Sequence, residues 1–182
     1  MSRETHLVEL VDPDGAPIGA ATVDEAHRQP GRLHRAFSVL LRSGDRVLVQ
    51  RRAAGKTRFP LRWANTCCGH PAPGTAVTAA AAVRLDEELG ITGVSLRQVG
   101  VYTYRADDPG TGRVEHEYDH VLIGDVDRDL PLLPDPAEVA QTSWVLLDEL
   151  LDALETEPDG YAPWLPGVLA LLPEAGRSGG RR

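Results

Sequence analysis

Cysteine is scarce in this chain of 182 residues, and long apolar runs are missing. The two cysteines, Cys67 and Cys68, are adjacent, and neighbouring residues do not have the Cα separation that an ordinary disulfide requires. We therefore expect two free thiols and a reducing compartment, the cytoplasm. Nowhere do eighteen apolar residues follow one another, so we expect no membrane-spanning helix and no membrane partner.

Lysine is scarcer still, because Lys56 is the single lysine among 19 basic residues. With 27 acidic residues the formal net charge is −8, so a nucleic-acid partner would have to bind against the field of the whole molecule, and we expect none. The apolar share of 42% excludes a disordered or fibrous chain. Without internal repeats, this length predicts one domain over residues 1–175 and a mobile tail over residues 176–182.

Apolar periodicity and turn residues predict a mixture of strands and helices. We expect strands over residues 7–11, 36–41, 46–52, 94–104, 115–126 and 143–147. We expect helices over residues 76–89, 148–154 and 164–172. The helix 76–89 has the clearest limits, because Thr75 precedes it and Gly90 closes it. Hairpins and crossovers together predict an α/β fold with a mixed sheet, in which the long loop 55–75 is functional.

Five potential metal ligands lie in three separate parts of the sequence: His27, His34, His70, Glu115 and Glu117. Pro30 and Gly31 prevent a continuous helix between the first two histidines, so a loop must bring them together. The two glutamates lie on an expected strand and project from the same face, because strand side chains alternate. Three imidazoles and two carboxylates suit Mg²⁺, Mn²⁺ or Zn²⁺.

Two further features of the long loop have both a functional and a structural interpretation. Cys68 precedes a glycine and lies two residues from a histidine, where a neighbouring cation could lower the pKa of the thiol. Cys67 is better interpreted as a small buried apolar residue. Arg51, Arg52 and Lys56 form a basic cluster that either binds an anion or is the solvated end of a strand.

The helix end Glu87–Ile91 resembles part of the Nudix box, a loop and helix whose glutamates hold Mg²⁺ against a diphosphate. The match is partial, because Thr75 stands where the pattern has glutamate and Val83-Arg84 where it has Arg-Glu. The missing helix carboxylate argues against diphosphate hydrolysis. What remains is a place to hold a metal and a diphosphate.

Eight segments in order resemble the type 1 isopentenyl-diphosphate isomerases: residues 26–27, 33–38, 50–52, 65–71, 87–90, 104–106, 115–117 and 163–164. The specific part is NTCCGHP at 65–71 followed by E-x-E at 115–117. The resemblance implies a Nudix-like α/β fold, a mixed sheet packed between helices. It also implies interconversion of isopentenyl diphosphate and dimethylallyl diphosphate in isoprenoid biosynthesis. A small prenyl diphosphate would be the partner, and the protein a monomer or weak homodimer.

The resemblance also implies which residues bind metal and diphosphate. The first metal would be held by His27, His34, His70, Glu115 and Glu117. The diphosphate would be bound by Arg52, Lys56 and Arg84, and Glu88 would hold a Mg²⁺ shared with its oxygens. Relatives usually carry a lysine four residues before the first metal histidine, where this chain has Val23. We therefore expect weaker diphosphate binding, or the recruitment of a neighbouring arginine such as Arg28.

Moving a double bond by one position requires a proton to be added at one carbon and another to be removed two carbons away. The resemblance implies Cys68 and Glu117 as the catalytic pair, with Tyr104 beside the carboxylate. Trp164 would face the developing tertiary carbocation, because an aromatic face attracts positive charge.

Two other functions stay open from the residues alone. A Nudix pyrophosphohydrolase is disfavoured by the residues missing from the box. A non-catalytic module that binds metal or diphosphate has nothing in its favour, because both members of the catalytic pair are present.

Overall fold

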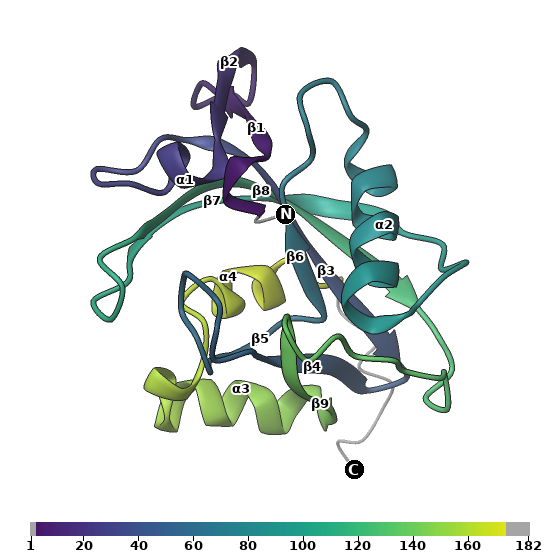
Figure 1. Cartoon of the computed structure of the whole chain (residues 1–182). Coiled ribbons are helices and arrows are strands. Elements are labelled where there is room, and N and C mark those ends of the chain that lie inside the picture. Colours follow the sequence, from purple (N-terminus) through teal and green to yellow (C-terminus); the bar gives the residue numbers. More distant parts are fainter. Residues whose placement is uncertain (1–2, 174–182) are drawn as a thin grey trace.

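The computed structural model describes residues 3–173, which form one nine-stranded sheet with helices around it (Figure 1). The strands are β1 (Leu7–Val11), β2 (Pro17–Thr22), β3 (His34–Ser43), β4 (Arg46–Arg52), β5 (Trp63–Ala64), β6 (Cys67–Gly69), β7 (Arg97–Asp107), β8 (Val114–Asp125) and β9 (Val139–Leu146). The helices are α1 (Val23–Ala26), α2 (Val77–Leu89), α3 (Leu147–Thr156) and α4 (Leu165–Ala170), with 3₁₀ turns η1 (Arg3–Thr5) and η2 (Pro158–Gly160).

The strand β3 organises the sheet. It pairs in parallel with β8 over nine residue pairs, from His34 opposite Glu117 to Arg42 opposite Asp125. It also pairs antiparallel with β6, β4 and β1. The strand β7 extends the sheet beyond β8, and β9 extends it beyond β4. The expected α/β fold with a mixed sheet is therefore confirmed.

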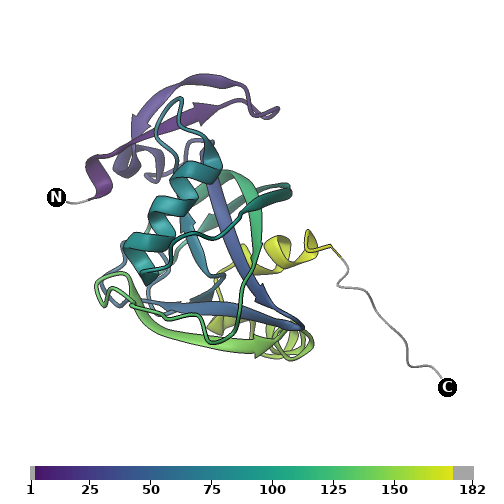
Figure 2. The ribbon, with the colours of Figure 1, turned by 90° about the vertical axis from the view of Figure 1, so that its right-hand side faces the viewer.

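The two faces of β3 belong to different layers. Phe37, Val39 and Leu41 pack in a core cluster that includes the buried residues of α2. Leu40, on the opposite face, packs in a cluster that includes the buried residues of α4. Figure 2 shows α2 and α4 on opposite sides of β3. On the face of β3 that carries Leu40, the next side chain toward the start of the strand is that of Ser38, which is buried and polar. This end of the sheet is therefore polar.

Several expected elements differ from the observed ones. The helix 76–89 is α2, and Gly90 closes it at φ +67°, as expected. The expected start at Ala76 is one residue early, because α2 begins at Val77 with Ala76 as its N-cap residue, and the Thr75 amide donates to the Ala72 carbonyl in the preceding turn. The hairpin strand β2 and the short helix α1 were not expected. The tail over residues 176–182 lies outside the described residues, and the domain limits stay a prediction.

The cysteines and the lengths of the helices bear on the expected environment of the protein. Both cysteines are free thiols, as expected, and Cys67 is buried. Within residues 3–173, no helix is long and apolar enough to cross a membrane.

Candidate active site

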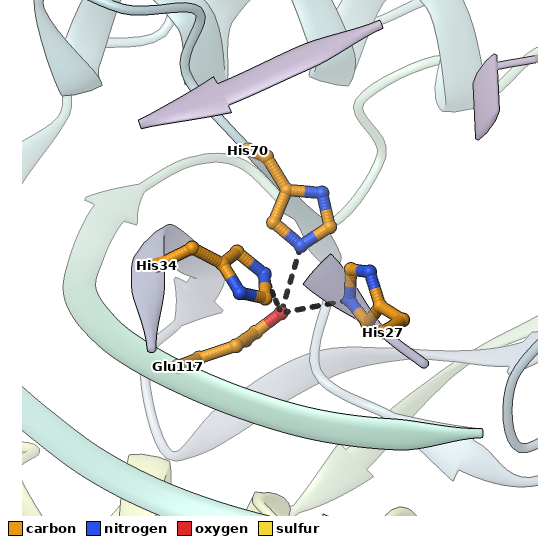
Figure 3. A group of neighbouring side chains, drawn as sticks. All are labelled: His27, His34, His70 and Glu117. Atoms are coloured by element: carbon orange, nitrogen blue, oxygen red, sulfur yellow. Dashed lines mark hydrogen bonds and ion pairs between the residues drawn. The ribbon is translucent and has the colours of Figure 1, made fainter. Parts of the chain in front are cut away.

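Three histidines and one glutamate meet at the polar end of the sheet (Figure 3). His27 follows α1, His34 begins β3, His70 follows β6 and Glu117 lies on β8. The nearest ligand atoms of the four side chains all lie within 4.8 Å of one another. Three parts of the sequence therefore contribute to one cluster, and the loop between the first two histidines folds them together as expected.

Backbone hydrogen bonds orient two of these imidazoles. The Nδ1 atom of His27 lies 2.7 Å from the Val23 carbonyl oxygen, and Nδ1 of His34 lies 2.8 Å from the Arg32 carbonyl oxygen. A carbonyl oxygen only accepts hydrogen bonds, so each Nδ1 carries the proton. When the ring is neutral, the lone pair is then on Nε2, and this is the arrangement that a metal ligand requires.

The cluster has the properties of a site for a divalent cation. The Glu117 Oε1 atom lies 2.8 Å from Nε2 of His70, 3.7 Å from Nε2 of His34 and 4.0 Å from Nε2 of His27. Nε2 of His34 is fully buried, and none of the described residues gives it a hydrogen bond. A buried nitrogen without a partner is costly unless something else binds it. Imidazole nitrogens with a carboxylate are a common ligand set for Zn²⁺ and Mn²⁺.

The protonation of the cluster in the absence of metal follows from burial and charge. Burial lowers the pKa of His70 to about 4, against the attraction of Glu117. For His27 burial is outweighed by the adjacent Glu115 carboxylate, which raises the pKa. Burial also opposes ionisation of Glu117, but the imidazoles of His34 and His70 hold its pKa well below the usual range. The carboxylate is thus ionised and available to a cation.

Glu115 lies next to this cluster. Its Oε2 atom is 2.9 Å from Nε2 of His27, and its Oε1 atom is 3.2 Å from Nε of Arg58. Both Glu115 and Glu117 are buried on the same side of β8, as the alternation of strand side chains predicts. Of the five expected ligands, four meet directly, and Glu115 joins them through His27.

The expected catalytic residues, Glu117 among them, line one pocket together with His70 of the metal cluster. The Tyr104 hydroxyl donates a hydrogen bond to Glu117 Oε2 at 2.8 Å. The indole of Trp164 is buried, and its ring centroid lies 6.0 Å from that of Tyr104. Cys68 lies on β6. Both β6 and β8 pair with β3, so the thiol and Glu117 belong to strands on the two edges of β3. A thiol, a phenol, a carboxylate and an aromatic face therefore surround one space.

The expectation of a lowered thiol pKa is wrong for the metal-free protein. Burial raises the pKa of Cys68 to about 12, and the carboxylate of Asp119 adds to the effect, while Arg52 opposes it. Burial likewise raises the pKa of Tyr104 well above the usual value, with Glu117 the next cause. Both groups therefore keep their protons at neutral pH.

Three polar residues near the thiol were not expected in the site. Asp119 is fully buried, and its Oδ2 atom accepts a hydrogen bond from the Ser38 hydroxyl at 2.7 Å. Asn65 is also fully buried, beside Cys68. The signal for Asp119 is the extended alternation E-x-E-x-D over residues 115–119, which places a third carboxylate on the same face of β8.

The basic residues expected to bind diphosphate line the same pocket. Lys56 and Arg84 both pair with the carboxylate of Glu138. Arg84 also pairs with Glu88, whose other oxygen accepts a hydrogen bond from Gln50 at 3.0 Å. The structure thus places Glu88 among cations, 2% exposed and apart from the histidine cluster.

Arg52 contacts the aromatic wall of the pocket, and its guanidinium carbon is 5.4 Å from the centroid of the Trp164 ring. Its Nε atom donates a hydrogen bond to the Phe59 carbonyl oxygen at 3.1 Å. The cation is therefore held near both the aromatic wall and the basic residues of the pocket.

Val23 lines the pocket and leaves an apolar surface there. Arg28, named as one candidate to replace the lysine, does not line the pocket, because its side chain is 66% exposed and pairs with Asp24. Two other arginines, Arg3 and Arg58, do line it. Arg58 is an unexpected member of the site, with its side chain 11% exposed.

Known proteins resemble this chain in fold and in sequence. Residues 32–167 match the NUDIX domain. A solved structure, DR0079 from Deinococcus radiodurans, has a TM-score of 0.73 at 19% identity and covers 91% of this chain and 98% of its own. A MutT NUDIX hydrolase from Burkholderia pseudomallei has a TM-score of 0.60 at 18% identity, covering 78% of this chain and 98% of its own. These likenesses confirm the Nudix-like fold.

Relatives with higher sequence identity to this chain share one name. The isopentenyl-diphosphate Delta-isomerase of Nocardia farcinica is 59% identical over 176 residues, which is 96% of this chain and 99% of the relative. The protein of the same description from Streptomyces coelicolor is 47% identical, over 92% of this chain and 84% of the relative. The chain belongs to the isopentenyl-diphosphate Delta-isomerase family. The family and the enzyme class expected from the sequence are confirmed.

Membership of the isomerase family gives the departures from the Nudix box a physical meaning. Arg84 stands where the box has a glutamate, and it lines the same pocket as His70 and Glu117. A cation at this place binds an anion, whereas a glutamate would hold a metal. In this isomerase the helix α2 therefore adds positive charge to the pocket.

Proposed function

We propose that this isomerase interconverts isopentenyl diphosphate and dimethylallyl diphosphate by protonation and deprotonation through a tertiary carbocation. The observation that carries the proposal is the pocket in which Cys68, Glu117, Tyr104 and Trp164 meet. The reaction adds a proton to the terminal carbon of the alkene and removes one two carbons away. No electrons or other atoms are exchanged, so two acid/base groups and a stabilising surface are sufficient.

Cys68 is one of the two acid/base groups, and Glu117 with Tyr104 is the other. The hydrogen bond from the Tyr104 hydroxyl to Glu117 makes a path along which a proton can pass to or from the substrate. The raised pKa of Cys68 means that its thiol holds a proton in the resting, metal-free protein. Because the reaction is reversible, each group donates in one direction and accepts in the other.

Trp164 faces the positive charge that forms between these two groups. Its indole is 2% exposed, which keeps water from the cation. The interaction of a cation with a desolvated indole contributes about 2 kcal/mol. Tyr104, stacked at 5.3 Å on Tyr102, extends the aromatic wall.

The metal and diphosphate residues have supporting roles. His27, His34, His70 and Glu117, with Glu115 beside them, fit a divalent cation such as Mn²⁺, Mg²⁺ or Zn²⁺. When bound, that cation supplies positive charge that orients Glu117 and favours its ionised form.

The diphosphate is the handle by which the substrate is bound. Arg52, Lys56 and Arg84 bind its oxygens, and Lys56 and Arg84 exchange the carboxylate of Glu138 for phosphate. Glu88 would hold a Mg²⁺ that the diphosphate shares. Binding energy gained there holds the reacting carbons between the acid/base groups.

The two free thiols support a reducing, cytoplasmic setting for this enzyme. A monomer or weak homodimer stays a prediction.

The test is incubation of the purified protein with isopentenyl diphosphate and Mg²⁺, followed by detection of the acid-labile allylic product. Cys68→Ala and Glu117→Gln should each remove nearly all turnover while the circular dichroism spectrum is retained. Cys67→Ala is the matched control, because this neighbouring thiol is fully buried and does not line the pocket. Activity like that of the wild type in either catalytic variant would defeat the proposal.

A further inference from the structure

One buried amide contacts two of the proposed catalytic groups. The Asn65 Oδ1 atom accepts a hydrogen bond from the Cys68 thiol at 3.2 Å and another from Nε1 of Trp164 at 3.0 Å. Trp164 is 99 positions further along the chain. A single oxygen atom therefore links the thiol of β6 to the indole that precedes α4.

The orientation of this amide is fixed by its other end. Nδ2 of Asn65 donates hydrogen bonds to the carbonyl oxygens of Val39, at 3.1 Å, and Cys67, at 2.9 Å. Carbonyl oxygens accept only, so the NH₂ group must face them. The reverse orientation would place this NH₂ group against the indole N–H, with a donor facing a donor. All hydrogen-bonding positions of the amide are then used, and Oδ1 has to face the thiol and the indole.

The two groups that Asn65 holds need such a restraint. A cysteine side chain has three staggered positions about its Cα–Cβ bond, and only some of them direct the sulfur into the pocket. The other polar contact of the Cys68 sulfur, with the Ser38 hydroxyl, is longer at 3.7 Å. The indole must also present its face to the position where the cation forms. A displacement of about 1 Å of a reacting group can lower a rate about a hundredfold.

We propose that Asn65 is a positioning residue that sets the Cys68 thiol and the Trp164 indole in a fixed relation to each other. This inference rests on the proposed function of those two residues. Asn65 does not line the pocket itself, so it acts through its two partners rather than on the substrate. Its loss should therefore slow the chemical step and leave substrate binding by the basic residues unchanged.

The adjacent residue provides a matched control. Thr66 is as fully buried as Asn65, donates a hydrogen bond from Oγ1 to the Leu48 carbonyl oxygen at 2.6 Å and accepts one from the Leu41 amide at 2.9 Å. None of its hydrogen-bonding partners belongs to the proposed catalytic set. Thr66→Val and Asn65→Leu each remove polar atoms from the same buried segment while keeping the number of side-chain heavy atoms.

The experiment compares the steady-state kinetics of these two variants with the wild type, with the amount of folded enzyme measured by thermal unfolding. Asn65→Leu should lower kcat about a hundredfold with KM for isopentenyl diphosphate unchanged. Thr66→Val should keep kcat within about twofold of the wild type, because only stability changes. Equal kcat values in the two variants would overturn the inference.

Asn65→Asp and Asn65→Ser keep the inference testable if Asn65→Leu does not fold. A buried aspartic acid takes up a proton and keeps a carbonyl oxygen for the thiol and the indole, whereas the shorter serine does not reach both. The kcat of Asn65→Asp should therefore exceed that of Asn65→Ser, and the opposite order or equal values would refute the positioning role. Lack of turnover in the wild type would instead defeat the proposed function.

Discussion

The Cys68 thiol should be a slow nucleophile in the metal-free protein. Its surroundings raise the pKa from the ordinary 9.0 to about 12, with burial as the main cause and Asp119 as the next. At a pH of about 8, a thiol of ordinary pKa is about one-tenth thiolate, and one with a pKa of about 12 is about one ten-thousandth thiolate. Alkylation of Cys68 by iodoacetamide should therefore be about a thousandfold slower than that of an exposed cysteine.

The assay follows labelling of the EDTA-treated protein by mass spectrometry, from about pH 7 to about pH 10. The rate should rise about tenfold for each pH unit without levelling off, because the pKa of Cys68 lies above the whole range. Cys68→Ala should lose the label that Cys67→Ala keeps. A plateau at about pH 9 would refute the reasoning, since it would mean that burial and Asp119 do not control this thiol.

Three further outcomes are expected. Tyr104→Phe removes the hydroxyl that donates to Glu117, so kcat should fall about a hundredfold at constant KM in steady-state assays, and an unchanged kcat would contradict the proposed proton path. Val23→Lys adds a cation to the pocket lining, so KM for isopentenyl diphosphate should decrease; an unchanged KM would reject this role for the position. Because the pKa of His27 is raised, protons compete with metal for this imidazole. Added Mn²⁺ should therefore raise the Tm of the EDTA-treated protein more at about pH 8 than at about pH 6. Equal shifts in Tm would argue against His27 as a ligand.

The parts of the site that follow from local sequence were predictable. Glu115 and Glu117 share a face because strand side chains alternate, and the pairing of β3 with β8 then places His34 opposite Glu117. The limits of α2 were predictable at its end, where only a residue that tolerates a left-handed backbone fits, as Gly90 does. Its start was not, because Ala76 makes no side-chain cap hydrogen bond.

Other parts depend on packing between distant segments. The pKa of Cys68 was expected to fall because the sequence presents the histidine nearby, whereas burial and Asp119 of another strand decide its direction. Asn65 gains Trp164 as a partner only when the segment before α4 packs against it, whereas its contact with Cys68 is local. Arg58 reaches the pocket beside Glu115, although they are far apart in the sequence. Contacts between such distant segments cannot be predicted from the spacing of residues in the sequence.

The parallel register of β3 and β8 limits where residues can be inserted into this chain or deleted from it. His34 and Glu117 meet in the metal cluster only while they stay opposite each other, and one added or deleted residue within either strand would turn the following side chains to the other face. Natural insertions and deletions should therefore avoid residues 34–42 and 114–125. They should concentrate in the connection over residues 126–138, whose side chains are mostly exposed. A library of single-codon deletions, selected for growth that depends on this enzyme, would reveal the same boundary.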